Sequence, residues 1–165
     1  MLFVQFSRSA GASFLLACLF AGALVTSRAD ATPTIYGTYY DDTPVENGCF
    51  NQTYCQFYFS QLPSNKLVLV RKILCSRTTS SRPVGVYFLV AQGSNGSNTL
   101  ARRLSLPVLA PVVQSNGYFL TSVDVDPRFL IGQSRYPYLQ ISTETTSGTL
   151  YGSCSLSGDL IDPIQ

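Results

Sequence analysis

Tyr118–Asp126, with the sequence YFLTSVDVD, alternates apolar and polar residues along its length. In an extended chain one face would carry Phe119, Thr121, Val123 and Val125, and the opposite face Tyr118, Ser122, Asp124 and Asp126. This period of two is typical of a β-strand with one buried face. The pattern recurs further on, where Leu139 and Ile141 alternate with Tyr138, Gln140 and Ser142. These stretches predict a fold that is built from strands.

Other segments, bounded by turn-forming residues, also predict strands. Lys66–Cys75 and Val84–Ala91 are evenly apolar and rich in Val and Leu, which is typical of strands that are central in a sheet or packed on both faces. The remaining candidates are Thr34–Tyr40, Cys55–Gln61, Leu100–Leu106 and Thr149–Leu156. Gly93–Asn98, a run of Gly, Ser and Asn, predicts the turn of a hairpin that joins Val84–Ala91 to Leu100–Leu106.

About eight short strands separated by turns predict an all-β fold, a single antiparallel β-sandwich. A jelly-roll-like path is the first choice, and an immunoglobulin-like path is the alternative. Asp126–Leu130 is expected to form a short turn or a helical crossing between the sheets. Leu106–Val113 contains Pro107 and Pro111, which cannot donate hydrogen bonds to a sheet. That segment is therefore expected at a sheet edge or in a connection.

The N-terminal segment has the layout of a secretory signal peptide. Arg8 precedes an apolar run, Ala12–Val25, and Ala29–Ala31 offers a small-residue cleavage site. We therefore expect residues 1–31 to be a signal peptide and residues 32–165 to form one secreted β-sandwich domain, periplasmic or extracellular. The apolar run is shorter than the roughly 20 residues that span a membrane, and no later run reaches that length. A membrane anchor and a lipoprotein are the alternatives for the N-terminal segment.

Cleavage would remove Cys18 and leave four cysteines, Cys49, Cys55, Cys75 and Cys154. An even number in an exported chain predicts two disulfides, and four cysteines allow three pairings. We favour Cys49–Cys55, which are close in sequence, together with Cys75–Cys154, which would tie an early strand to the last one. A metal or redox site is disfavoured, because the chain has no C-x-x-C motif and no histidine.

The lack of histidine restricts the chemistry of the chain. A Ser-His-Asp triad, a Cys-His dyad and a zinc site with histidine ligands are all excluded. The G-x-S-x-G and P-loop motifs are absent as well. We therefore expect a protein without catalytic residues, metal or cofactor. Charged residues make up 12% of the chain and form no basic stripe, so no nucleic-acid partner is expected.

Aspartates are the remaining candidates for catalysis or metal binding. Asp124 and Asp126 would share one face of their strand, at a spacing compatible with glycoside hydrolysis by two carboxyl groups. The favoured interpretation is a solvated strand face that leads into a turn. A hard cation such as Ca²⁺ is the alternative use for the acids near the ends of the domain, which are Asp41, Asp42, Asp159 and Asp162. No complete calcium motif is present, so solvated loop residues are the favoured interpretation there too.

Tyrosine is frequent in this chain. The candidates for a binding role are Tyr36, Tyr39, Tyr40, Tyr136, Tyr138 and Tyr151. A tyrosine combines an apolar ring with a polar tip, which suits stacking on a sugar or anchoring an interface. Packing across strands is the favoured interpretation, because tyrosine is a common strand residue. The absence of tryptophan further weakens the case for a sugar platform.

Two segments carry a resemblance to known proteins. Gln61–Val70 (QLPSNKLVLV), which runs on to Cys75, and Gly152–Ile161 (GSCSLSGDLI) resemble segments of small exported β-sandwich proteins of Gram-negative bacteria. The resemblance implies a secreted β-sandwich with a Cys75–Cys154 disulfide, and it implies no activity. Cys49 and Cys55 are an addition to the two-cysteine pattern of those proteins.

The sequence thus favours a secreted, disulfide-stabilised, non-catalytic binding protein whose ligand is a polysaccharide. One alternative is a structural or assembly subunit of the cell envelope or of a pilus, which would bind an envelope protein by β-strand addition. A carboxylate-based hydrolase that uses Asp124 and Asp126 is the other alternative.

Overall fold

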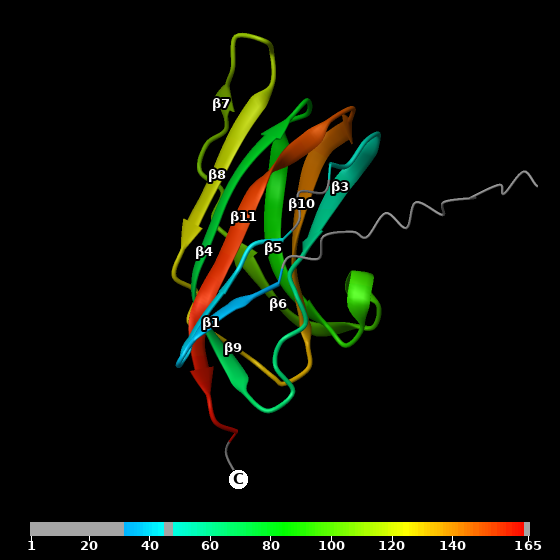
Figure 1. Cartoon of the computed structure of the whole chain (residues 1–165). Helices are drawn as coiled ribbons and strands as arrows, with labels where there is room; N and C mark the ends of the chain where they lie inside the picture. The colour runs from blue at the N-terminus through cyan, green and yellow to red at the C-terminus, as the bar shows by residue number, and fades with distance from the viewer. Residues whose placement is uncertain (1–31, 45–47, 164–165) are drawn as a thin grey trace, which may run out of the picture.

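The computed structural model describes residues 32–44 and 48–163, and most of these residues lie in β-strands. Two antiparallel sheets pack against each other (Figure 1). The prediction of an all-β antiparallel sandwich is therefore confirmed. The expected signal peptide, residues 1–31, lies outside the described residues.

The described residues form a larger sheet A and a smaller sheet B. Across sheet A the order is β1 (Thr34–Tyr36), β2 (Tyr39–Asp42), β11 (Leu150–Ile161), β4 (Leu67–Thr79), β8 (Phe119–Val125) and β7 (Val112–Val113), while β9 (Phe129–Ile131) also pairs with β4. Across sheet B the order is β3 (Gln52–Tyr58), β10 (Tyr136–Ser147), β5 (Pro83–Ala91) and β6 (Thr99–Leu106). A 3₁₀ turn, η1 (Ser94–Gly96), connects β5 to β6. In this part of the chain no helix is long and apolar enough to cross a bilayer.

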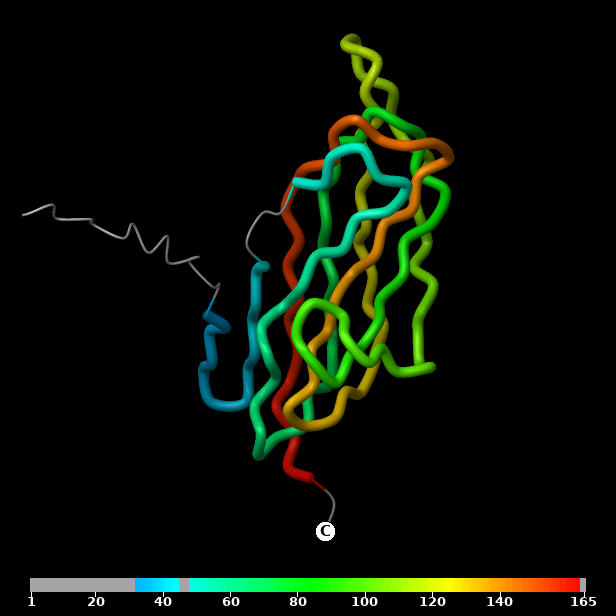
Figure 2. The backbone as a smooth tube through the Cα atoms, turned by 90° about the vertical axis from the view of Figure 1, so that its right-hand side faces the viewer, coloured from blue at the N-terminus to red at the C-terminus, as the bar shows by residue number. Residues whose placement is uncertain are grey.

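The strand pairs are nested inside one another. β5 pairs with β6, β4 with β8, β3 with β10, and β2 with β11. The chain therefore forms one long hairpin, closed at the β5–β6 turn and rolled up so that its two sides contribute to both sheets. This is the jelly-roll path that the sequence favoured, and the immunoglobulin-like alternative does not apply. Figure 2 turns the roll so that its β3 and β10 side faces the reader.

Two segments differ from the sequence-based expectation. Thr34–Tyr40 is part of a hairpin rather than one strand, because Gly37, at φ 60°, reverses the chain between β1 and β2. Asp126–Leu130 does not cross between the sheets. After Arg128, which adopts a left-handed φ of 46°, Phe129 begins β9, and β9 stays in sheet A by pairing with β4. The proline-containing segment before β8 lies at a sheet edge, as expected, since β7 is the outermost strand there.

The core lies between the sheets and consists of the alternate, inward-facing residues of each strand. Phe57, Phe88 and Leu139 from sheet B and Leu156 from sheet A are completely buried. The rings of Phe88 and Phe129 meet edge to face, with centroids 5.6 Å apart. Burial of one such side chain contributes roughly 1.5–3 kcal/mol. The residues between these core positions must face outward, and they form the two external faces of the sandwich.

Both favoured disulfides are present. Cys75 and Cys154 lie directly opposite each other on β4 and β11, with their Cα atoms 4.1 Å apart. Cys49 is bonded to Cys55 over a Cα distance of 5.7 Å, which fixes the middle of β3 to the segment before the strand. The first disulfide thus joins two neighbouring strands within sheet A, and the second constrains a local loop.

A β-bulge in strand β4 of sheet A lies at two basic residues, Arg71 and Lys72. Ser157 of β11 pairs with Lys72 of β4, but the next residue, Gly158, pairs with Val70, so Arg71 is an extra residue. The bulge increases the local twist of the strand and changes the direction of its side chains. Arg71 and Lys72 both reach acidic residues on neighbouring parts of sheet A.

Candidate functional site

The external surface of sheet B is rich in aromatic and amide side chains. Every second residue along its strands faces this surface, which places eleven residues there: Tyr54, Gln56 and Tyr58 of β3, Tyr138, Gln140 and Ser142 of β10, Gly85, Tyr87 and Leu89 of β5, and Arg103 and Ser105 of β6. Their neighbours along the strands, such as Phe57, Leu139 and Phe88, belong to the core. We call this surface the tyrosine–glutamine face.

Two glutamines lie near the centre of the tyrosine–glutamine face. Gln56 and Gln140 occupy opposite positions on β3 and β10, and the Nε2 group of Gln56 donates to Oε1 of Gln140 at 3.1 Å. The hydroxyl of Tyr58 donates to Oε1 of Gln56. Within the described chain the Nε2 group of Gln140 has no hydrogen-bond partner, so it is available as a donor to a ligand. These contacts hold both amides in place at a surface that solvent reaches.

One end of the face is closed by the β5–β6 connection. The rings of Tyr58 and Tyr138 lie 5.5 Å apart, centroid to centroid. Gly96 of η1 lies over them, because a Cβ atom at Gly96 would be 3.3 Å from Tyr58 Cε1 and 3.7 Å from Tyr138 Cζ. The hydroxyls of Tyr138 and Thr99 are 2.7 Å apart. Burial raises the pKa of Tyr58, and Figure 2 shows the η1 loop crossing in front of this end of sheet B.

The other end of the face is open and aromatic. Tyr54, at 48% exposure, is the most accessible of its tyrosines. Tyr87 leans along its own strand over Gly85, since a Cβ atom at Gly85 would lie 2.9 Å from the Tyr87 hydroxyl and 3.1 Å from two ring carbons. Tyr87 also pairs in register with Gln140. A glycine at this position therefore lets an aromatic ring lie low against the sheet, next to the glutamine pair.

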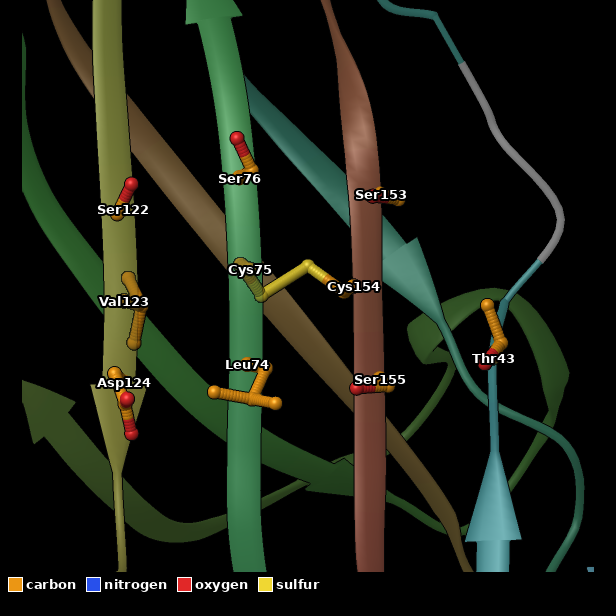
Figure 3. A pocket seen from close by; sticks show the side chains of 10 residues that line it. All are labelled: Thr43, Leu74, Cys75, Ser76, Ser122, Val123, Asp124, Ser153, Cys154 and Ser155. Atoms are coloured by element: carbon orange, nitrogen blue, oxygen red, sulfur yellow. A yellow bond between two sulfur atoms is a disulfide. The ribbon is translucent and has the colours of Figure 1, made fainter.

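A second candidate is a hollow of about 510 Å³ on the external surface of sheet A. Ser153, Ser76 and Ser122 lie in one row across β11, β4 and β8. Figure 3 shows this serine row beside Leu74, with the Cys75–Cys154 disulfide between two of the strands. The hollow offers small hydroxyl groups, the Asp124 carboxylate and the apolar side chains of Leu74 and Val123, but no aromatic ring lines it.

Asp124 and Asp126 lie on the same exposed surface of sheet A, where both contact Lys72. The ammonium of Lys72 pairs with a carboxylate oxygen of Asp124 and lies 3.2 Å from one of Asp126. These hydrogen bonds raise the pKa of Lys72. The two carboxylates share a face, as expected, and their contacts are those of a surface ion-pair cluster.

Three of the four acids near the ends of the domain are engaged in other contacts. Asp42 is 2% exposed and accepts hydrogen bonds from the Ser60 backbone NH at 2.7 Å and from the Tyr40 hydroxyl at 3.3 Å. Burial raises the pKa of Asp42, against these hydrogen bonds, which lower it. Asp159 pairs with Arg71 at 2.7 Å, and Asp162 pairs with Lys66. No group of three or more metal-ligating side chains occurs among the described residues.

The tyrosines singled out from the sequence do not form one site. Tyr36 and Tyr39 face each other across the β1–β2 hairpin and are exposed, whereas Tyr151 lies at the start of β11 on sheet A. Tyr40 and Tyr138 are almost fully buried, so neither ring is free to stack on a ligand. The half-buried Tyr136 begins β10. Burial is also the main reason that the pKa of Tyr40 is far above its ordinary value.

Sequence reasoning missed most of the residues that make up the face: Tyr54, Gln56, Tyr87 and Gln140 of its open part, and Arg103, which pairs with Leu89 in the same row as Tyr138. A usable signal exists in β3, where Tyr54, Gln56 and Tyr58 alternate with Cys55 and Phe57. That alternation identifies a solvated strand face but not its neighbours. The neighbours depend on the register between β3, β10 and β5.

In comparisons with known proteins, no protein-family model matches this chain, and neither a curated protein nor a solved structure matches it. The geometry of the two external faces is therefore the basis for a functional assignment.

Proposed function

We propose that this protein is a secreted or periplasmic, non-catalytic binding protein that holds a polysaccharide on the tyrosine–glutamine face. The observation that carries the proposal is the Gln56–Gln140 amide pair, held in register and flanked by the rings of Tyr54 and Tyr87. Aromatic rings pack against the C–H faces of sugars, and amides exchange hydrogen bonds with their hydroxyl groups. A site of this composition binds sugars without needing a catalytic residue.

The rigidity of the platform supports the proposal. Sheet strands carry all the side chains of the face, and the amides already hydrogen-bond within the protein, so little side-chain freedom is lost when a ligand binds. The two ends of the face differ in access: η1 covers the end at Tyr58 and Tyr138, whereas the end at Tyr54 is open to solvent. We infer that an extended sugar chain lies across the open end.

The proposal that this protein is exported rests on features outside the tyrosine–glutamine face. Two disulfides fit an oxidising compartment outside the cytoplasm. The N-terminal sequence has the pattern of a signal peptide, and the resemblance to exported proteins of Gram-negative bacteria points in the same direction.

Affinity electrophoresis of the oxidised protein tests the proposal, with gels that contain single bacterial or plant polysaccharides. We expect selective retardation by at least one polymer, and loss of that retardation in Tyr54→Ala and Gln140→Ala. Tyr151→Ala is the matched control, because Tyr151 is 50% exposed, close to the 48% of Tyr54, but lies on sheet A. Equal loss in all three variants, or no retardation by any polymer, would refute the proposal.

An assembly subunit is the second candidate, and one observation favours it. Val112 and Val113 of edge strand β7 and Leu109 in the connection before it are each more than 60% exposed. The nested strand pairs are all supplied by the described chain itself, so a partner strand would add at an edge rather than complete the roll. A monomer in sedimentation experiments at high protein concentration would argue against self-assembly at this edge.

A further inference from the structure

We infer that the ligand of the tyrosine–glutamine face is an acidic polysaccharide, whose carboxylate groups pair with Arg103. This inference rests on the proposed function and adds the chemical class of the sugar. Arg103 lies on β6 opposite Leu89, and its guanidinium carbon is 5.9 Å from the ring centroid of Tyr87. An arginine is thus placed beside the same ring that flanks the glutamine pair.

The charge of Arg103 is not neutralised within the protein. Arg103 is exposed and forms no ion pair with any described residue. Its neighbour Arg102 is used differently, because its guanidinium lies 3.9 Å from the Phe129 ring centroid and donates to the Leu130 carbonyl at 2.7 Å. Arg102 therefore links the two sheets, while Arg103 remains available to a ligand.

The eleven residues of the tyrosine–glutamine face include one cation, Arg103, and no acid. Glu144 is the one acidic residue in the four strands of sheet B; it is exposed on β10 two residues beyond Ser142, and its NH donates to the Arg82 carbonyl. On sheet A, by contrast, Lys66, Arg71 and Lys72 each pair with an aspartate. An acidic ligand would meet Arg103 on sheet B, unpaired among the described residues, whereas these three cations of sheet A are already paired.

A guanidinium is well suited to this role. Its planar set of N–H donors matches a carboxylate with two parallel hydrogen bonds, and its charge does not titrate in the physiological range. A single exposed ion pair contributes only modestly, but a polymer presents many carboxylates to the same site. The preference for the acidic form should therefore be measurable and should weaken as salt is added.

The test compares polymers of the same backbone whose carboxylates are free or esterified: polygalacturonate with its methyl ester, and alginate with its propylene glycol ester. We expect wild-type protein to bind at least one acid form on the order of fivefold more tightly than its ester at low salt. Arg103→Gln should remove this preference by lowering the affinity for the acid form toward that for the ester. Arg128→Gln, which makes the same charge change in the β8–β9 connection of sheet A, is the control and should retain the preference.

The possible failures are distinguishable. Equal binding of acid and ester, lost on Tyr54→Ala, would overturn the acidic ligand and preserve the polysaccharide site. Loss of the preference in both arginine variants would assign it to net charge and overturn the role of Arg103. No binding to any polymer of a broader neutral and acidic panel would overturn the proposed function and this inference together.

Discussion

Gln56 and Gln140 are 84 residues apart in sequence, yet they lie directly opposite each other on β3 and β10 with their amides hydrogen-bonded at 3.1 Å. This contact depends on the register that the jelly-roll path imposes on the two strands. A one-residue shift of either strand would turn its own glutamine into the core and its own core residue, Phe57 or Leu139, outward. The packing of the core therefore fixes the position of the proposed binding residues.

Replacement of Gln140 by leucine should affect binding far more than folding. The side chain lies on a partly solvated face, so we expect the free energy of unfolding to change by less than about 1 kcal/mol. Loss of the amide should reduce polysaccharide affinity by on the order of tenfold, because a buried sugar hydroxyl would be left without its partner. Urea denaturation and affinity electrophoresis of the same preparation measure the two effects. A stability loss as large as the binding loss would mean that the glutamine pair is structural.

The two disulfides should differ in their contribution to stability. Cys75 and Cys154 are separated by 79 residues and Cys49 and Cys55 by 6. On the loop-entropy model, removal of the long-range disulfide costs about 4.5 kcal/mol and removal of the short one about 2 kcal/mol. Paired Cys→Ala variants, compared by urea denaturation, measure both values. A greater loss from the Cys49–Cys55 variant would contradict the model for this fold.

Gly152 should not tolerate a side chain. It has a φ of 145°, and a Cβ atom there would collide with the Ser76 carbonyl oxygen and lie 2.9 Å from Arg77 Cα. We expect Gly152→Ala to destabilise the protein by about 3 kcal/mol, because backbone of the neighbouring strand would have to move. Gly117→Ala is the control: it also has a positive φ but open space around it, and should cost about 1 kcal/mol. Similar losses in the two variants would show that backbone conformation, and not the collision, determines the cost.

Asp42 should make stability depend on pH in an unusual direction for a carboxylate. Burial raises its pKa in the folded protein, so the folded state binds this proton more tightly than the unfolded state does. The resulting stabilisation is fully present below the unfolded pKa of about 3.9 and is lost as the pH rises through the higher folded value. Asp42→Asn should remove this part of the pH dependence. Unfolding free energies measured from pH 3 to 7 in both proteins provide the test, and unchanged slopes would contradict it.

The strands were predictable because their alternation is local. Tyr118–Asp126 places every second residue in the core, and the β8 found there has this pattern. The role of Tyr40 was not predictable in the same way. Its ring is buried and its hydroxyl meets Asp42, which in turn holds Ser60 in the connection between β3 and β4. Such burial depends on a contact between segments that the sequence pattern does not connect.

The burial of Tyr138, on the opposite sheet, was likewise not predictable from the local sequence pattern. Alternation with Leu139 correctly places it on the external face of β10, but Gly96 of the β5–β6 connection covers it. The candidate site was missed for a related reason, since Tyr87 lies in a segment whose apolar composition predicts only a central strand. Register across three strands, rather than composition, brings Tyr87 beside Gln140.

The position of β11 has a consequence for how the chain reaches its native state. β11 is the last strand of the described chain, yet it lies inside sheet A, between β2 and β4. Until Leu150–Ile161 has been synthesised and is free to move, both of those earlier strands lack a neighbour, and Cys75 lacks its disulfide partner. Because such long-range pairing is slow, partly made chains expose open strand edges that are prone to aggregate. A chaperone that holds the nascent chain unfolded until its final strand emerges would therefore raise the yield of native protein.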